Sequence, residues 1–178
     1  MTKKLVYISL LVGLSIILTR VLSIRIPMGN VEGVRIGFGG FPIIFGGIIL
    51  GPVAGGIIGA VADLIGFFIN PMGAYMPHFT LTSALTGIIP GFLFFYVFKK
   101  QYKIFYLILC VAVGQIITSV LLVPYLISVL FGAPFKVLFI PRAITQAIQI
   151  PIYAVMIKLI ENRGLNLNFD HLKRAKNK

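Results

Sequence analysis

Four side chains spaced 4, 3 and 4 positions apart form the clearest chemical pattern in this 178-residue chain. They are Arg142, Gln146, Gln149 and Tyr153, and a helix would present all of them on one face. An arginine and two glutamines within apolar sequence need partners, because an unsatisfied polar group is costly in lipid. Arginine pairs well with carboxylate or phosphate through its fork of donors. This face therefore favours contact with an anionic solute.

Asp63 is the one acidic residue inside the apolar stretches. Helical spacing places it on one face with Phe67 and Asn70. Its carboxylate could accept hydrogen bonds from a ligand. It could also form an internal ion pair with Arg142 or Arg35, with no ligand involved. The sequence leaves both interpretations open.

The composition shows what must surround these side chains. Of all residues, 58% are hydrophobic and 11% are charged, and the mean hydropathy is +1.03. A soluble domain normally carries about 25% charged residues, so a soluble enzyme, a nucleic-acid-binding module and a disordered tail are all poor interpretations. Apolar stretches of about 20 residues, each long enough to cross a bilayer, recur along the chain. The sequence predicts a polytopic membrane protein with a single domain.

Six apolar segments predict an all-α integral membrane protein with six transmembrane helices. The segments cover residues 5–23, 36–50, 53–69, 79–98, 104–130 and 139–160. The second and third are short, at about 15 to 17 residues against the usual ~20, and could end in buried non-helical backbone. The predicted organisation is a transmembrane domain over residues 1–162, followed by a short basic tail over residues 163–178.

The positive charges predict how the chain crosses the membrane. The net charge is +12, from 16 lysines and arginines against 4 acidic residues. Placing both termini in the cytoplasm puts eleven basic residues inside and five outside, as the positive-inside rule requires. Topology therefore explains the charge better than nucleic-acid binding does. We expect a multi-pass protein of the cell membrane, with its tail beside anionic lipid head groups.

In this topology most polar side chains gather in the outer half of the membrane, whereas the inner half is apolar. That asymmetry predicts a pocket open to the outside and closed below, because a continuous pore would need polar lining at every depth. Outer arginines favour an anionic ligand, and aromatic residues could stack on a ring. Individual serines and threonines could instead bond to their own helix carbonyls. The predicted substrate contacts are Arg25, Arg35, Asp63, Phe67, Asn70, Tyr75, His78, Phe79, Thr80, Thr82, Ser83, Tyr125, Arg142 and Gln146.

Motifs for catalysis and cofactor binding are missing from the sequence. It has no Walker loop of the form GxxxxGK[ST], no HExxH and no GxSxG. Its two histidines, His78 and His171, fall on opposite sides of the membrane in the predicted topology, which excludes a metal site or catalytic dyad built from them. Cys110 is the only cysteine, so no disulfide forms within one chain. We therefore expect no enzymatic activity, no cofactor and no metal.

Glycine recurs every four residues at Gly47, Gly51, Gly55 and Gly59. Small residues at this spacing let helix backbones approach closely in lipid. The pattern fits static packing or a sliding surface, and static packing is the simpler interpretation. Gly51 followed by Pro52 predicts a tight cytoplasmic turn between two helices.

Several segments resemble a known family. They are RIGFGGFP at residues 35–42, Gly51-Pro52, Asp63, NPMGAYMPHFTLT at residues 70–82, Gly87 and Pro90-Gly91. Together they resemble the substrate-binding S components of energy-coupling factor (ECF) vitamin transporters, most of all the folate-type subgroup. The similarity covers nearly the whole chain in length and span count, and it is most specific over residues 35–91.

The resemblance implies a six-helix membrane protein that captures a vitamin from outside with high affinity, with folate as the leading ligand. It also implies partners, namely a transmembrane T component and two cytoplasmic ATPases, with which the S component topples in the membrane. The outer loops at residues 23–35 and 70–78 would gate the pocket. Family members carry an Ala-xxx-Ala docking motif on the first helix, where this chain has Ser9-xxx-Gly13. We expect Ser9 and Gly13 to lie on the face that docks to the T component.

Other functions fit parts of the sequence. Within the family, the ligand could be another vitamin or precursor, such as a hydroxymethylpyrimidine, thiamin or pantothenate. Outside it, a stand-alone channel or secondary carrier would transport without ATPase partners. An intramembrane enzyme lacks its motifs, and a purely structural protein leaves Asp63 and the glutamine face unexplained.

Overall fold

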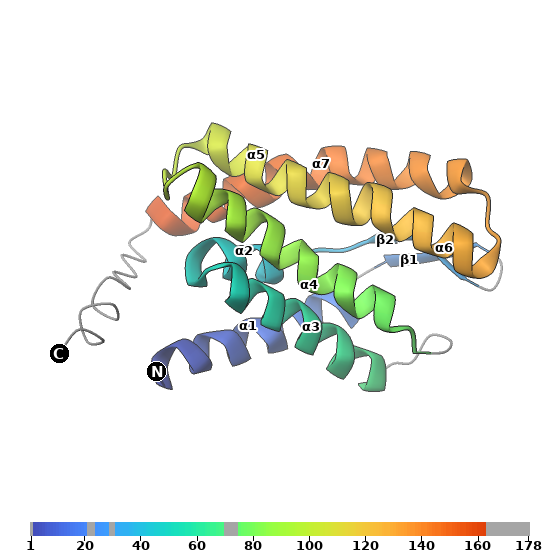
Figure 1. The fold of residues 1–178 in the computed structure, drawn as a ribbon, viewed down its shortest axis with the longest axis horizontal. Coiled ribbons are helices and arrows are strands. Elements are labelled where there is room, and N and C mark those ends of the chain that lie inside the picture. The colour runs from blue at the N-terminus through green and yellow to red at the C-terminus, as the bar shows by residue number, and fades with distance from the viewer. Residues whose placement is uncertain (1, 21–23, 29–30, 70–74, 163–178) are drawn as a thin grey trace.

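The computed structural model describes residues 2–20, 24–28, 31–69 and 75–162. Its elements are α1 (Thr2–Arg20), β1 (Ile24–Met28), β2 (Val31–Ile36), α2 (Gly40–Leu50), α3 (Pro52–Ile69), α4 (Pro77–Phe92), η1 (Leu93–Val97), α5 (Ile104–Gln115), η2 (Ile116–Leu122), α6 (Val123–Phe131) and α7 (Phe135–Asn162). The helices run along one long axis (Figure 1). The start of α1 and the end of α7 lie at one end of this bundle, and the hairpin of β1 and β2 lies at the other.

Four helical segments in the described residues are long and apolar enough to cross a membrane: Pro52–Ile69, Pro77–Val97, Ile104–Phe131 and Phe135–Asn162. They confirm four of the predicted segments to within a few residues. Helix α1 has 19 residues and carries Lys3, Lys4 and Arg20 near its ends. Helix α2 has only 11 residues, because β2 ends at Ile36 and residues 37–39 come before the helix begins at Gly40. The count of six spans remains a prediction.

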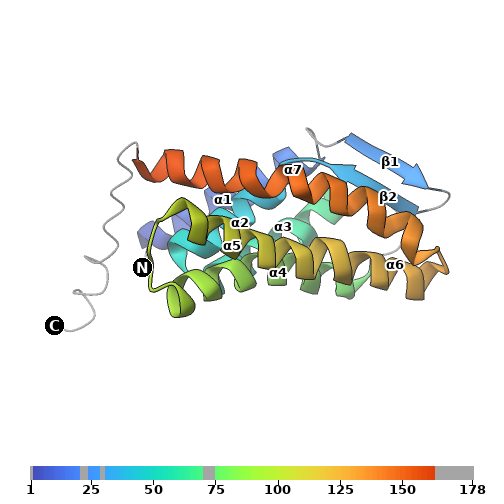
Figure 2. The same cartoon turned by 90° about the horizontal axis from the view of Figure 1, so that it is seen from above.

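A short β-hairpin joins the first two helices, where the sequence interpretation expects a plain loop. Strands β1 and β2 pair antiparallel, with Arg25 opposite Arg35. The register shifts between Ile26 and Pro27, and a bulge is a position where proline, which lacks an N–H donor, is tolerated. The hairpin lies beside the first half of α7 (Figure 2). Alternating residues around Gly29-Asn30 are the sequence signal that could have identified this addition to the helical fold.

Glycines bring α2, α3 and α4 into backbone contact. A Cβ atom on Gly55 would lie 2.6 Å from the Cα atom of Gly47 and 2.8 Å from the carbonyl oxygen of Gly87. A Cβ atom on Gly87 would in turn meet the carbonyl group of Gly55. The four-residue glycine spacing therefore serves close packing of three helices. Gly51, with φ of 101°, ends α2, and Pro52 begins α3, which confirms a turn between these two helices. Its cytoplasmic side remains a prediction.

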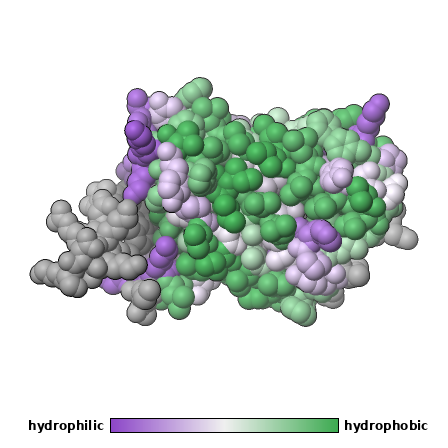
Figure 3. Space-filling view, in the orientation of Figure 1, coloured by the Kyte–Doolittle hydropathy of each residue, from purple (hydrophilic) through white to green (hydrophobic). Residues whose placement is uncertain are grey.

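Two apolar clusters form the core of the bundle. One joins α2, η1, α5 and α7 around Ile44, Phe94 and Leu107. The other joins α1, α2 and α3 around Leu11 and Ile58. The outer surface is a broad apolar band, with hydrophilic residues gathered mainly toward its ends (Figure 3). Such a surface suits a bundle that is surrounded by lipid.

Candidate functional site

A cavity of about 310 Å³ lies between the helices, within the range of small-molecule pockets, about 300–1,000 Å³. Most of the residues that line it belong to the parts of the helices nearer the hairpin, and the others lie near the middle of the bundle. They are Ser15, Thr19, Arg20, Gly37, Gly39, Gly40, Ile43, Gly59, Ala62, Asp63, Phe67, Tyr75, Met76, Phe79, Thr82, Ser83, Thr86, Gln115, Ser119, Val123, Ile127, Phe131, Arg142, Thr145, Gln146, Gln149 and Tyr153.

Regular helical spacing explains why these residues share one cavity. On α4, Phe79, Thr82 and Thr86 recur at intervals of three and four residues, so they lie on one face. On α7, the series predicted from the sequence, which begins at Arg142 and ends at Tyr153, lines the cavity as a continuous face. Helices α4 and α7 therefore each contribute one face with several polar residues to a shared interior.

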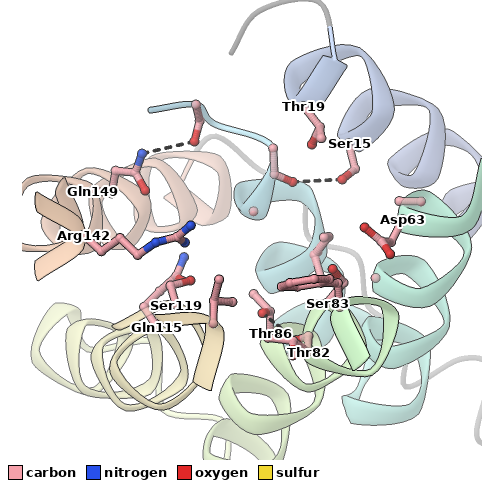
Figure 4. Close-up of a pocket in the computed structure, with 18 of the residues that line it drawn as sticks. Ser15, Thr19, Asp63, Thr82, Ser83, Thr86, Gln115, Ser119, Arg142 and Gln149 are labelled. Atoms are coloured by element: carbon pink, nitrogen blue, oxygen red, sulfur yellow. Dashed lines mark hydrogen bonds between the residues drawn. The ribbon is translucent and has the colours of Figure 1, made fainter. Parts of the chain in front are cut away.

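Two opposite walls of the cavity differ in chemical character (Figure 4). Arg142 and Gln115 extend from the side of α7 and α5, whereas Asp63 and Ser83 extend from the side of α3 and α4. An anionic group could therefore bind at the first wall and an N–H donor at the second. Within the described part of the chain, no three histidine, cysteine, aspartate or glutamate residues gather as a metal site.

A hydrogen-bond chain connects Asp63 to the residues that precede α4. The Oγ1 atom of Thr80 donates to Oδ2 of Asp63 at 2.7 Å, and the hydroxyl of Tyr75 lies 2.9 Å from Thr80 Oγ1. Because Thr80 has one hydroxyl hydrogen and gives it to Asp63, Tyr75 is the donor in the second bond. The ring centroid of Tyr75 lies 5.2 Å from that of Phe67. Among the described residues Asp63 forms no ion pair, and its Oδ1 atom is available to a ligand.

The glycine-rich segment at residues 37–40 fastens three helices around the cavity. Nε2 of Gln149 and the hydroxyl of Tyr153 both donate to the carbonyl oxygen of Gly37, at 3.1 Å each. The hydroxyl of Ser15 donates to the carbonyl oxygen of Gly39 at 2.9 Å (Figure 4). This segment thus joins α1 and α7 to the start of α2.

Gln115 and Gln146 use their amide groups differently. Oε1 of Gln115 accepts a hydrogen bond from Ser119 at 2.7 Å, which leaves its Nε2 group as a donor. Gln146 lines the cavity and is only 8% exposed, and its Oε1 atom has no partner among the described residues. A buried acceptor of this kind lowers stability until a donor reaches it. Gln146 is therefore the side chain that most strongly indicates a ligand with an N–H or O–H group.

Comparisons with known proteins agree with this architecture. A family model described as ECF-type riboflavin transporter, S component, matches residues 1–162. The folate transporter FolT of Clostridium novyi (strain NT) is 35% identical over 153 residues, which are 86% of this chain and 84% of that protein. The chain belongs to the ECF transporter S-component family. S components are substrate-binding subunits of membrane transporters rather than enzymes, and this one is a multi-pass membrane protein.

Two solved structures share the fold of this S component. A crystal structure of FolT bound with folic acid matches with a TM-score of 0.76 at 28% identity, over 92% of this chain and 95% of that one. A structure of the S component of a bacterial ECF transporter matches with a TM-score of 0.64 at 21% identity, over 93% and 97% of the two chains. The second likeness supports the fold alone.

The structure divides the predicted contacts of this S component into those that line the cavity, those that do not line it, and those outside the described residues. Thr80 stands behind Asp63 and orients it instead of lining the cavity. Asn70 and the side chains of Arg25 and Arg35 lie outside the described residues. The predicted contacts that do line the cavity are Asp63, Phe67, Tyr75, Phe79, Thr82, Ser83, Arg142 and Gln146.

Tyr125 and His78 lie away from the cavity. Tyr125 is 58% exposed on α6, whereas Val123 and Ile127 line the cavity. A step of two residues turns about 200° around a helix, so Tyr125 faces the other side. The π-helical segment η2 also shifts the phase of this helix relative to the continuous α-helix expected there. His78 is exposed in the first turn of α4, one residue before Phe79.

Part of the polar lining is missing from the contacts predicted from the sequence. Ser15, Thr19 and Arg20 enter the cavity from the end of α1. The sequence feature that could have identified them is the four-residue interval between Ser15 and Thr19 within an apolar stretch. The other polar additions are Thr86, Gln115, Ser119, Thr145, Gln149 and Tyr153.

Ser9 and Gly13 lie on α1 away from the cavity. Ser9 is exposed, and its hydroxyl donates to the carbonyl oxygen of Leu5 at 3.1 Å. A Cβ atom on Gly13 would meet nothing within 4 Å. This face of α1 therefore has open space beside it.

Proposed function

We propose that this chain binds folate, as the substrate-binding subunit of an ECF importer. The observation that carries the proposal is the cavity with Arg142 on one wall and Asp63 on the opposite wall. It occurs in a chain that is 35% identical to a folate transporter, and the structure of a protein bound with folic acid shares its fold.

The chemistry of folate complements the two walls. Its glutamate portion carries carboxylates, for which the guanidinium of Arg142 is a suitable partner. Its amino-pterin edge carries N–H donors, for which Oδ1 of Asp63 and Oε1 of Gln146 are suitable acceptors. The rings of Phe67 and Phe79 line the same cavity and can pack on the flat pterin ring.

The proposed transport cycle requires partners that energise this subunit. We assign these roles to a T component and two ATPases, because the chain has no Walker loop of its own. We place the cavity toward the outside and both termini in the cytoplasm, with six spans in residues 1–162 and a basic tail in residues 163–178. Ser9 and Gly13 would form the docking face for the T component, since both residues are small and a Cβ atom on Gly13 would meet nothing within 4 Å.

Riboflavin is the second candidate ligand, because the matching family model is described by that vitamin. Its isoalloxazine ring could pack on the aromatic residues of the cavity, and its ribityl hydroxyls could bond to amide groups. It carries no carboxylate, however, whereas folate offers carboxylates that suit the guanidinium of Arg142. Folate therefore fits the cavity better.

Identification of the bound ligand tests the proposal directly. The full chain is purified from cells grown in vitamin-replete medium and denatured, and the released molecules are identified by mass spectrometry. We expect folate. Calorimetric titration with folate and riboflavin then ranks their affinities. This method is suitable because the chain has no tryptophan whose fluorescence could report binding. Release of riboflavin alone, or tighter binding of riboflavin, would overturn the assignment.

Two substitutions test the walls of the cavity. Asp63→Ala and Arg142→Ala should each weaken folate binding by about 30-fold or more, because each removes a charged hydrogen-bonding partner. Glu161→Gln and Lys136→Ala are matched controls, since both residues lie outside the cavity lining. Unchanged folate affinity in both cavity variants would remove the proposed roles.

A further inference from the structure

The turn between η1 and α5 has a backbone that is unusual for its residue types. Lys99 and Lys100 have φ values of 46° and 61°, a left-handed conformation that glycine adopts with less strain than any residue with a Cβ atom. The N–H group of Lys100 donates to the carbonyl oxygen of Phe94 at 2.9 Å, which holds this conformation. The backbone conformation alone would favour glycine at both positions.

Aromatic rings lie close to two of the cationic groups of this turn. Nζ of Lys100 lies 5.0 Å from the ring centroid of Phe95, and Nζ of Lys103 lies 5.9 Å from that of Tyr106. Both distances are within the range of cation–π attraction. We call the exposed residues Lys99, Lys100 and Lys103 the lysine turn.

No acidic side chain neutralises the lysine turn within the described part of the chain. Glu161, the acidic residue at this end of the bundle, pairs instead with Lys158 at 2.6 Å. Burial, and then the negative charge of Glu161, raise the pKa of Tyr102, so this phenol is uncharged at neutral pH. Among the residues that the structure describes, the lysine turn therefore presents three formal positive charges without a counter-ion.

The lysine turn lies where the apolar outer surface of the bundle ends. Tyr96, just before it, is 67% exposed, and Phe105, just after it, is 64% exposed. In a membrane protein such side chains face lipid, with aromatic residues near the head groups. Hydrophilic residues gather at this end of the molecule (Figure 3). The lysine side chains therefore reach the depth at which lipid phosphates lie.

We propose that the lysine turn is a binding site for the phosphate group of an anionic phospholipid. The cation–π contacts restrict the side chains of Lys100 and Lys103 before binding, which reduces the entropy lost when a phosphate binds. The apolar surface beside Tyr96 and Phe105 can accommodate the acyl chains of the same lipid. This inference concerns a surface distant from the cavity and does not depend on the vitamin that is bound there.

The double variant Lys99→Gly/Lys100→Gly removes two positive charges without straining the backbone, because glycine accepts the positive φ values of both residues. Full-length protein in detergent is titrated with phosphatidylglycerol, and the rise of its unfolding temperature gives an apparent affinity. Parallel titrations use phosphatidylcholine and inorganic phosphate. The matched control, Lys3→Gln/Lys4→Gln, removes two lysines from α1 at the same end of the molecule.

We expect phosphatidylglycerol to stabilise the wild-type protein more than phosphatidylcholine does. The glycine variant should bind phosphatidylglycerol about 30-fold more weakly while its unfolding temperature without lipid stays equal or rises. The control variant should retain the wild-type response. The proposal is overturned by an unchanged response in the glycine variant, by an equal loss in the control, or by equal stabilisation with inorganic phosphate.

Discussion

Two glutamines of α7, three residues apart and both buried, have opposite roles at the scale of single side chains. Nε2 of Gln149 donates to the carbonyl oxygen of Gly37 and so holds the glycine-rich segment. Oε1 of Gln146 has no partner in the described residues and lines the cavity. Their spacing predicted a shared face, but only the surrounding atoms distinguish the structural glutamine from the one that is open to a ligand.

This difference predicts effects of opposite sign. Gln146→Leu should raise the free energy of unfolding without ligand by about 1 kcal/mol, because it removes a buried acceptor that has no partner. The same change should weaken folate binding about tenfold. Gln149→Leu should lower the unfolding free energy by about 1–3 kcal/mol, because it removes a donor from Gly37. Denaturant unfolding and calorimetric titration measure both quantities, and equal destabilisation by the two variants would contradict this distinction.

At the scale of elements, the contacts between helices differ from one part of the bundle to another. Backbone contact at Gly47, Gly55 and Gly87 locks α2, α3 and α4 together, whereas η2 interrupts the regular turns between α5 and α6 beside the cavity. The glycine spacing is visible in the sequence because its period matches the helix. The π-helical segment is not, because it depends on how Ile116–Leu122 packs between neighbouring helices.

The glycine contact predicts a large difference between two changes to alanine. Gly87→Ala should lower the unfolding free energy by about 1–3 kcal/mol, since its Cβ atom would overlap the carbonyl group of Gly55. Gly13→Ala should raise it by up to about 1 kcal/mol, because alanine favours the helix and finds open space there. Thermal unfolding in detergent makes the comparison, and a stable Gly87→Ala protein would argue against tight backbone packing.

The whole molecule has two unlike ends. The cavity lies mostly in the half near the hairpin, whereas the cluster around Phe94 and Leu107 lies mostly in the other half, and Tyr153 belongs to both. The sequence predicted this asymmetry from the depth of its polar residues. The distribution of the basic residues along the chain predicted the orientation in the membrane.

Cysteine labelling can test that orientation. The native Cys110 is fully buried, so it contributes little background. On intact cells, a membrane-impermeant maleimide should label Lys136→Cys, near the hairpin end, and should label Gln101→Cys only after permeabilisation. The reverse pattern would place both termini outside and refute the proposed topology.

Docking to a T component predicts that transport and binding can be separated. Gly13→Leu should leave folate affinity within about threefold of the wild type, because Gly13 lies outside the cavity. Uptake by cells that also express a T component and ATPases should be lost, since a bulky side chain blocks close helix contact. Ala147→Leu, an exposed small-to-large change on α7, should preserve uptake. Normal uptake with Gly13→Leu would move the docking face elsewhere.

Periodic features could be predicted from the sequence, because the helix repeats every 3.6 residues and polar side chains in lipid must face inward. They include the four long apolar helices, the Gly51-Pro52 turn, and the faces that carry Asp63 and Arg142. The tertiary structure alone decided which neighbours meet across the bundle. It paired Asp63 with Thr80 instead of an arginine, rotated Tyr125 away from the cavity, and brought Ser15 of α1 to the carbonyl oxygen of Gly39. The first and third outcomes depend on contacts between residues far apart in the chain, which no local spacing encodes, and the second depends in part on the π-helical segment η2.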